Sequence, residues 1–215
     1  MEAVRKLVQI SATIGREFSY EVIAALSPTG EETLQAGLQQ LVNTELVYHR
    51  GLGSPATYIY RHALIQDTAY QSLFKSKRQQ YHQQIAQVLE ARFAETVVTQ
   101  PELVAHHYTD ASLISQVIPY WQQAGQRAAQ RSANAEAVSH FTTALEPLQT
   151  LPDRPECNQH ELSLDVTLGV SIMAAKGFAA PEVGNIYRRA RELCEQVGTP
   201  LRLLRHCMGC GRFLL

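Results

Sequence analysis

Residues 61–73 read RHALIQDTAYQSL, and this stretch decides how the rest of the chain is interpreted. It follows two short strand-like runs and opens a long series of helical patterns. The chain has no G-x-x-x-x-G-K-[ST] phosphate loop, whose backbone amides and lysine would hold the phosphates of ATP. The stretch therefore predicts a junction between a small N-terminal domain and a helical region, without a nucleotide-hydrolysing core.

Upstream of this junction, helical periodicity gives way to strand-like patterns. Apolar stripes predict a helix that ends at Gly15, a short helix over Phe18–Leu26, and a third helix from Glu31 to Leu46. Two strand-like runs, 46–49 and 57–60, flank the turn residues 51–55. Three helices followed by a hairpin is the order of a winged-helix domain, which we assign to residues 1–75.

Downstream of the junction the pattern is helical. Residues 63 to about 93 return to helical periodicity, and we assign 76–112 to a connecting helical region.

Residues 113–200 then contain an internal repeat with tetratricopeptide spacing. Small residues at fixed positions let two antiparallel helices approach closely, and large ones fill the space beside them. The first copy consists of Trp121, Gly125, Ala137, Phe141 and Ala144, with Pro152 closing it slightly late, and a weaker second copy contains Gly169, Tyr187 and Ala190. The predicted fold class is mainly α: a winged-helix domain followed by tetratricopeptide-like α-hairpins.

The order of four segments resembles a known family. RHALIQDTAYQSL is followed by RQQYHQQIAQVLEARF, QPELVAHHYTDA and IPYWQQAGQRAAQRSANAEAVSHFTTAL. This order looks like the region after the ATPase module in bacterial STAND-type predicted ATPases, which are often fused to class III adenylyl or guanylyl cyclase domains. GFAAPEVGNIYRRARELCEQVG resembles their next repeat, and the likeness extends to about Pro200. It implies a regulatory and protein-interaction fragment, and Met1 is expected to lie inside a longer parent protein.

The resemblance also implies a site. In related switch ATPases a histidine at the start of the helix after the wing contacts the β-phosphate of bound ADP. His62, preceded by Arg61, occupies a similar place, although Ala63 stands where an acidic residue often follows. The alternative for His62 is a local backbone hydrogen bond at a strand–helix junction. No cofactor is expected in this chain; ATP or ADP belongs to the presumed parent, and the partner is its ATPase module or another protein domain.

Composition restricts the other classes of function. A hydrophobic content of 45% is typical of a globular chain. With a net charge of −1, the chain has no overall positive electrostatic potential that would attract nucleic acid. No apolar run suggests a signal peptide or a spanning helix, so we expect no membrane association and a cytoplasmic location. No catalytic constellation is apparent, and we predict that the chain itself is not an enzyme.

Metal binding is not expected either. Four scattered cysteines include one C-x-x-C, Cys207 and Cys210 after His206, but no second ligand pair accompanies it. His82, His106 and His107 lack a carboxylate or cysteine at ligand spacing, and adjacent histidines on a helix point about 100° apart. Packing or surface roles are the simpler interpretation of these histidines.

Two other functions stay open. A winged helix can bind DNA as part of a large ATP-dependent transcription regulator, but residues 31–46 contain three glutamates and no lysine or arginine to neutralise phosphates. The cluster Lys75, Lys77 and Arg78 lies outside that helix.

The other function is protein binding by the repeat region. Its arginines either meet acidic partners or are solvated: Arg127, Arg131, Arg188, Arg189 and Arg191.

The last residues, 201–215, form an atypical tail, LRLLRHCMGCGRFLL, which is apolar to its end. An uncapped helical array exposes apolar surface. A truncation or frameshift in the gene would produce such a tail, and an inert pseudogene product is the third hypothesis.

Overall fold

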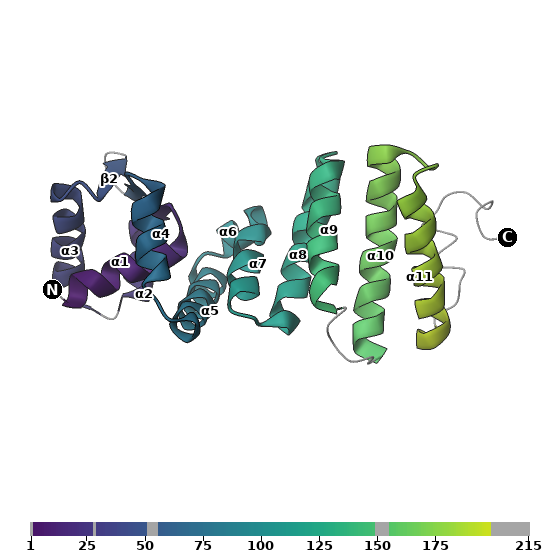
Figure 1. The fold of residues 1–215 in the computed structure, drawn as a ribbon, viewed down its shortest axis with the longest axis horizontal. Helices are drawn as coiled ribbons and strands as arrows, with labels where there is room; N and C mark the ends of the chain where they lie inside the picture. The colour runs from purple at the N-terminus through teal and green to yellow at the C-terminus, as the bar shows by residue number, and fades with distance from the viewer. Residues whose placement is uncertain (1, 28, 51–55, 149–154, 199–215) are drawn as a thin grey trace. The chain divides into compact units, whose positions relative to one another are not determined.

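The computed structural model describes residues 2–27, 29–50, 56–148 and 155–198, and these residues are mainly helical, as the sequence predicted (Figure 1). They divide into two compact units. The first comprises residues up to Thr99 together with His106–Leu113, and the second comprises Gln100–Ala105 with the described residues from Ile114 onward. The predicted connecting region, 76–112, is therefore grouped mostly with the first unit. The predicted tail, 201–215, lies outside the described residues, as do the turn 51–55 and Pro152.

The first unit begins with three helices around a small sheet. Helix α1 (Glu2–Ile14) is followed by β1 (Glu17–Ser19), α2 (Tyr20–Leu26) and α3 (Glu31–Asn43). Ser19 caps α2 by accepting a hydrogen bond from the Val22 amide at 3.3 Å. Glu31 and Glu32 lie in the first turn of α3, where the helix dipole favours negative charge.

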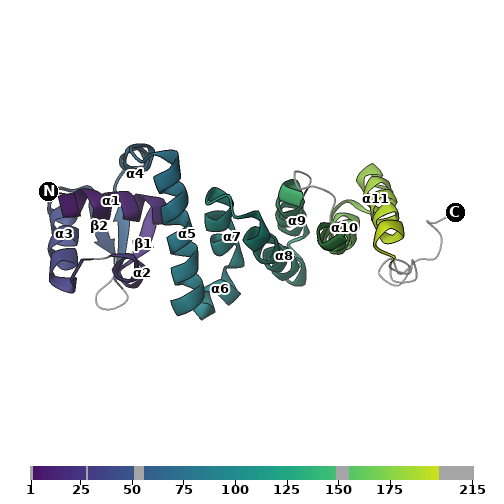
Figure 2. The same cartoon turned by 90° about the horizontal axis from the view of Figure 1, so that it is seen from below.

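The sheet of the described residues has three antiparallel strands in the order β1-β3-β2 (Figure 2). Strands β2 (Val47–Arg50) and β3 (Thr57–Tyr60) form a hairpin, in which Val47 lies opposite Tyr60 and His49 opposite Tyr58. The core between helices and sheet is apolar and contains Leu7, Ile10, Phe18, Ile23, Leu34, Leu38, Leu41, Val47 and Tyr60. The Tyr60 hydroxyl reaches Ser11 Oγ at 2.6 Å and donates to the Val8 carbonyl at 3.0 Å, and burial raises the pKa of Tyr60 to about 12.

Two local predictions differ from the structure. Phe18 lies in a strand rather than in a helix, because β1 pairs with β3 along Glu17–Ser19. The third helix ends at Asn43 instead of Leu46, since Glu45 takes a left-handed φ of 58° and turns the chain into β2. Residues 63 to about 93 are helical, as expected, and form two helices, α4 (Ala63–Gln71) and α5 (Lys75–Arg92), separated by a turn.

The first unit is completed by α5, by α6 (Ala94–Thr99) and by the second half of α7 (Pro101–Asp110). Helix α5 packs against α1 and α2. It buries Tyr81, His82, Ile85 and Leu89, so a polar side chain stands within an otherwise apolar face.

The second unit contains four long helices: α8 (Ile114–Gln130), α9 (Asn134–Leu148), α10 (Pro155–Lys176) and α11 (Pro181–Val197). Each packs against the next along the chain, and Figure 1 shows α8 beside α9 and α10 beside α11. Ser132 takes a left-handed φ of 61° in the turn that joins α8 to α9. Alanines fill the closest contacts, since Ala128, Ala137, Ala144 and Ala190 have no exposed surface.

Within the described ranges, none of the helices combines the length and the apolar composition needed to cross a bilayer.

Candidate functional site

The strand–helix junction places Arg61 and His62 at the end of β3. The Arg61 amide donates to the Leu46 carbonyl at 3.0 Å, which fixes the backbone, and its guanidinium forms an ion pair with Glu45. Both of these side chains are well exposed, so the pair contributes little to stability.

His62 is the N-cap residue of α4, with extended backbone angles of φ −129° and ψ 137°. Its side chain is exposed and makes no capping hydrogen bond to the helix. The local alternative, a side chain hydrogen-bonded to nearby backbone, is therefore not what the structure shows. An imidazole at this place, beside the amides of the first turn of α4, is available to an external acceptor or donor.

Helix α4 offers further exposed surface next to His62. None of its residues is buried, and Leu64 is 76% exposed. A large apolar side chain standing in solvent at the start of a helix is a feature that a protein partner would cover.

In the second unit, the residues predicted for the first repeat lie together. Trp121 is buried and stacks on His140, with 5.2 Å between ring centroids. Gly125 of α8 faces Phe141 of α9 so closely that a Cβ at Gly125 would lie 2.6 Å from the ring. Ala137 and Ala144 are also buried, on α9.

The second hairpin repeats this contact. Gly169 of α10 faces Tyr187 of α11, and a Cβ at Gly169 would lie 2.9 Å from the ring. Ala190 is fully buried one turn further along α11. The glycine-to-aromatic contact therefore fixes the helix spacing in both hairpins.

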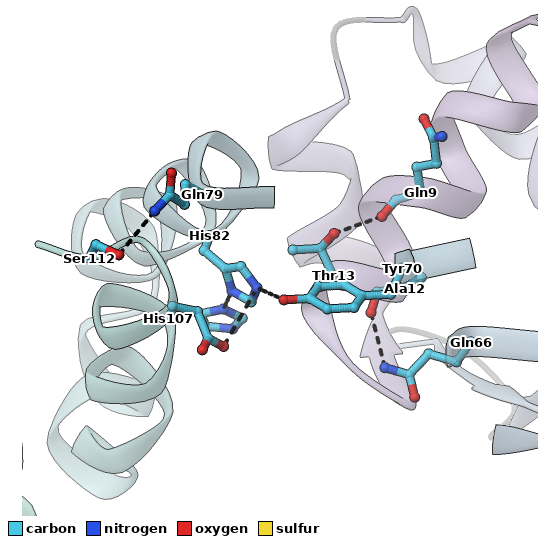
Figure 3. Close-up of polar contacts among 10 residues, drawn as sticks. Gln9, Ala12, Thr13, Gln66, Tyr70, Gln79, His82, His107 and Ser112 are labelled. Atoms are coloured by element: carbon cyan, nitrogen blue, oxygen red, sulfur yellow. Dashed lines mark hydrogen bonds and ion pairs between the residues drawn. The ribbon is translucent and has the colours of Figure 1, made fainter. Parts of the chain in front are cut away.

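The first unit contains a buried polar network that the sequence does not reveal (Figure 3). His82 on α5 meets His107 on α7, with 2.9 Å between their Nδ1 atoms. The Tyr70 hydroxyl lies 3.0 Å from His82 Nε2, and Asp110 Oδ2 lies 3.6 Å from the same nitrogen. Both histidines are buried, each with 4% of its surface exposed. His106 is exposed, as expected for the neighbour of a buried helical residue.

Both buried histidines are neutral at ordinary pH. Burial, and then the neighbouring His82 and His106, lower the pKa of His107 from 6.5 to about 3. Burial also lowers the pKa of His82, against the attraction of Asp110. When the folded pKa is depressed, the unfolded chain binds protons first. The stability of the first unit is therefore retained above pH 6.5 and lost as pH falls from about 6.5 towards 3.

A second buried ionisable group stands on α10. Asp165 is 5% exposed, and its Oδ2 has no hydrogen-bond partner within the described residues. Burial, and then Glu161, raise its pKa to about 7, although Arg189 opposes them. Arg189 itself holds Glu161 with two hydrogen bonds of 2.7 and 3.1 Å. Asp165 is thus a buried carboxyl group beside a completed ion pair.

No group of three potential metal ligands gathers in the part of the chain that the structure describes. Cys157 and Cys194 are unpaired thiols, and Cys194 is buried. Cys207 and Cys210 lie outside the described residues.

Comparison with known proteins finds a distant likeness. An uncharacterized protein of Rhizobium meliloti (strain 1021) is 22% identical over 193 residues, which cover 89% of this chain and 19% of that protein. The chain thus spans about a fifth of the length of this relative. No protein-family profile matches the chain, and no solved structure matches it either.

The structure therefore brings together some predicted residues and leaves others apart. The packing residues of each hairpin meet across their helices, as the glycine contacts show. His62 and Arg61 are adjacent in space, but Arg61 is turned to Glu45. The histidine network and Asp165 add buried polar groups that the spacing of the sequence did not reveal.

Proposed function

We propose that this chain is a non-catalytic regulatory and protein-interaction part of a cytoplasmic STAND-type signalling ATPase, of the kind often fused to class III adenylyl or guanylyl cyclase domains. The parent supplies the ATP- or ADP-binding module, and the present residues sense its state. The observation that carries the proposal is the exposed, uncapped His62 at the start of α4.

The position of His62 suits a phosphate sensor. It follows β3 directly, and Tyr60 and Arg61 hold the strand end through amide hydrogen bonds of 2.9 and 3.0 Å. A side chain on such a fixed backbone loses little freedom on binding. Hydrogen bonds from imidazole to a charged phosphate contribute about 1.5–3 kcal/mol, enough to bias a two-state switch.

The order of elements supports the finer description of the fold. Three helices precede the β2–β3 hairpin, which is the winged-helix order, and β1 adds a third strand. The hairpins α8–α9 and α10–α11 pair small with large residues, which is the tetratricopeptide principle. Helical repeats of this type present surfaces for other proteins.

The length of the Rhizobium meliloti protein is compatible with a modular parent, because only about a fifth of it corresponds to this chain. That leaves room for the ATPase and output modules in a protein of that size.

The DNA-binding alternative has less support. The exposed face of α3 contains Glu31, Glu32, Gln35 and Gln39, so it offers amides and carboxylates instead of cations. A duplex binder needs basic side chains against its phosphates.

The test uses the intact gene. We expect the DNA upstream of this coding sequence to encode a G-x-x-x-x-G-K-[ST] module, and the full-length protein to bind ADP. His62→Ala in that protein should weaken ADP binding by about tenfold or more, as measured by calorimetry.

His160→Ala is the matched control, since His160 is an exposed histidine on α10. It should leave the ADP affinity unchanged. ATP hydrolysis or cyclase activity by the purified 215-residue chain would contradict the proposal. So would an upstream region without a phosphate loop.

A further inference from the structure

A hollow of about 410 Å³ opens on the first unit between α2, α3 and the β2–β3 hairpin. Neither Arg61 nor His62 is among the residues that line it. Aromatic rings and amide groups line it: Tyr20, Gln35, Gln39, Val42, His49 and Tyr58. No lysine or arginine is among these residues.

The aromatic wall is held in place by the sheet. His49 and Tyr58 are direct partners across the antiparallel strands, and their rings lie edge to face at 5.3 Å. The other side of Tyr58 stacks on the buried Phe18 at 5.6 Å. Tyr20 is close enough that, after burial, its hydroxyl is the second cause of the raised pKa of Tyr58. The rings are therefore positioned before any ligand arrives.

The polar side of the hollow presents acceptors. Gln35 Nε2 donates to Glu31 Oε1 at 3.2 Å, and the Tyr20 hydroxyl donates to the same oxygen at 3.4 Å. Because a carboxylate can only accept, the Gln35 end that faces Glu31 is its NH₂ group. Among the described residues, Gln35 Oε1 and Glu31 Oε2 then have no hydrogen-bond partner.

The charge around the hollow is negative. Glu21, Glu31 and Glu32 are exposed on α2 and α3. Arg50 follows His49 on β2, and successive strand residues point to opposite faces, so its side chain leaves from the other face of the sheet.

We propose that this hollow binds the arginine side chain of a basic segment in a partner protein. A guanidinium has five donors and no acceptor, which complements the oxygens of Gln35 and Glu31. It also stacks on aromatic faces, and Tyr20 provides one beside the Tyr58 ring. Lysine suits the site less well, because its ammonium is a compact, strongly hydrated charge that cannot stack. A nucleic acid would bring phosphates against the glutamates.

The experiment measures binding of a short fluorescein-labelled peptide with two adjacent arginines to the full chain, by fluorescence anisotropy. The same peptide with citrulline in place of arginine keeps the shape and removes the charge. We expect the arginine peptide to bind at least about threefold more tightly than the citrulline peptide. The corresponding lysine peptide should lie between them.

Variants assign the binding to the hollow. Glu31→Gln should weaken the arginine peptide by about two- to fivefold, and Tyr20→Leu by about three- to tenfold. Glu32→Gln, one residue along the same helix, should have a clearly smaller effect, because Glu31, and not Glu32, accepts the hydrogen bonds from Tyr20 and Gln35. A circular dichroism melt checks that each variant is folded. If Tyr20→Leu does not fold, Glu31→Gln alone tests the site.

Three results would overturn the proposal. One is equal binding of the arginine and citrulline peptides, and another is an equal effect of Glu31→Gln and Glu32→Gln. The third is binding of single-stranded oligothymidylate that Tyr20→Leu abolishes, because this would assign the hollow to nucleic acid bases. His62 plays no part in these measurements, so the proposed nucleotide sensor and this site succeed or fail separately.

Discussion

The contact between Gly125 and Phe141 predicts that Gly125→Ala destabilises the chain when Phe141 is present and stabilises it when a smaller side chain replaces Phe141. Alanine is about 1 kcal/mol more favourable than glycine within a helix, so Gly125→Ala in α8 would stabilise the helix if space allowed. The new Cβ would lie 2.6 Å from the Phe141 ring, however, and atoms at this distance must move apart. Overpacking of this kind costs about 1–3 kcal/mol beyond the helix gain. We expect a net loss of about 1–2 kcal/mol.

Phe141→Leu should remove the clash. Alone it costs about 1–2 kcal/mol through lost packing. In the Phe141→Leu background, Gly125→Ala should be neutral or stabilising by up to about 1 kcal/mol. The coupling energy between the two positions is then about 2 kcal/mol, well above the limit for independent sites.

The assay is urea unfolding followed by the fluorescence of Trp121. It is the sole tryptophan of the chain and lies in α8, so its signal reports the second unit. Gly184→Ala is the matched control, because Gly184 also lies within a helix but a Cβ there would meet nothing within 4 Å. It should stabilise by about 0.5–1 kcal/mol in either background. If Gly125→Ala also stabilises the otherwise unchanged chain, the close approach of α8 and α9 is wrong.

Three further predictions concern ionisable groups, of which His107 and Asp165 are buried. Acidification from about pH 7 to about pH 5 should destabilise the first unit by about 2 kcal/mol through His107. His107→Gln should flatten this dependence in hydrogen exchange of the α5 amides. The pKa of the Asp165 carboxyl group is raised from 3.8 to about 7 in the folded chain, so its ionisation destabilises the second unit. Asp165→Asn should therefore stabilise this unit by about 4 kcal/mol above pH 7. The advantage should vanish near pH 4, and a gain that persists there would contradict it. Arg189→Ala should cost about 1 kcal/mol in Trp121-monitored unfolding, because it breaks the bidentate pair with the half-buried Glu161; a melt as stable as that of the unchanged chain would show that the pair is solvated in solution.

Helical periodicity predicted the core faces where a helix contributes a continuous stripe. Leu34, Leu38 and Leu41 recur at helical spacing within the apolar stripe of α3, and all three are buried. The spacing of Gly125 and Phe141 likewise predicted a contact between two helices, because the repeat pattern specifies which residues face each other.

Short strands and tertiary contacts could not be predicted from helical periodicity. Phe18 and Val22 have helical spacing, whereas β1 has three residues and is defined only by pairing with β3. Glu45 gave no sign of its left-handed backbone, because glutamate rarely adopts it.

The candidate functional residues were likewise predictable only where a continuous stretch of sequence identified them. His62 was singled out through the family resemblance, and it is the N-cap residue of α4. The hollow beside α3 joins Tyr20, Gln35 and Tyr58 from three separate elements, and no spacing in the sequence connects them. His82 and His107 are separated by 25 positions, so their contact appears only in the folded chain.

The contact between His82 and His107 restricts which substitutions the two positions can accept during evolution. Since their Nδ1 atoms face each other at 2.9 Å, only one of them can carry the proton, and the two rings must be opposite partners in a single hydrogen bond. Replacement of one ring leaves the other with a buried, unsatisfied nitrogen, which costs about 1–3 kcal/mol. Replacement of both by apolar side chains of similar shape can be nearly neutral. Descendants of this gene should therefore keep both histidines or lose both, and sequences with one alone should be rare.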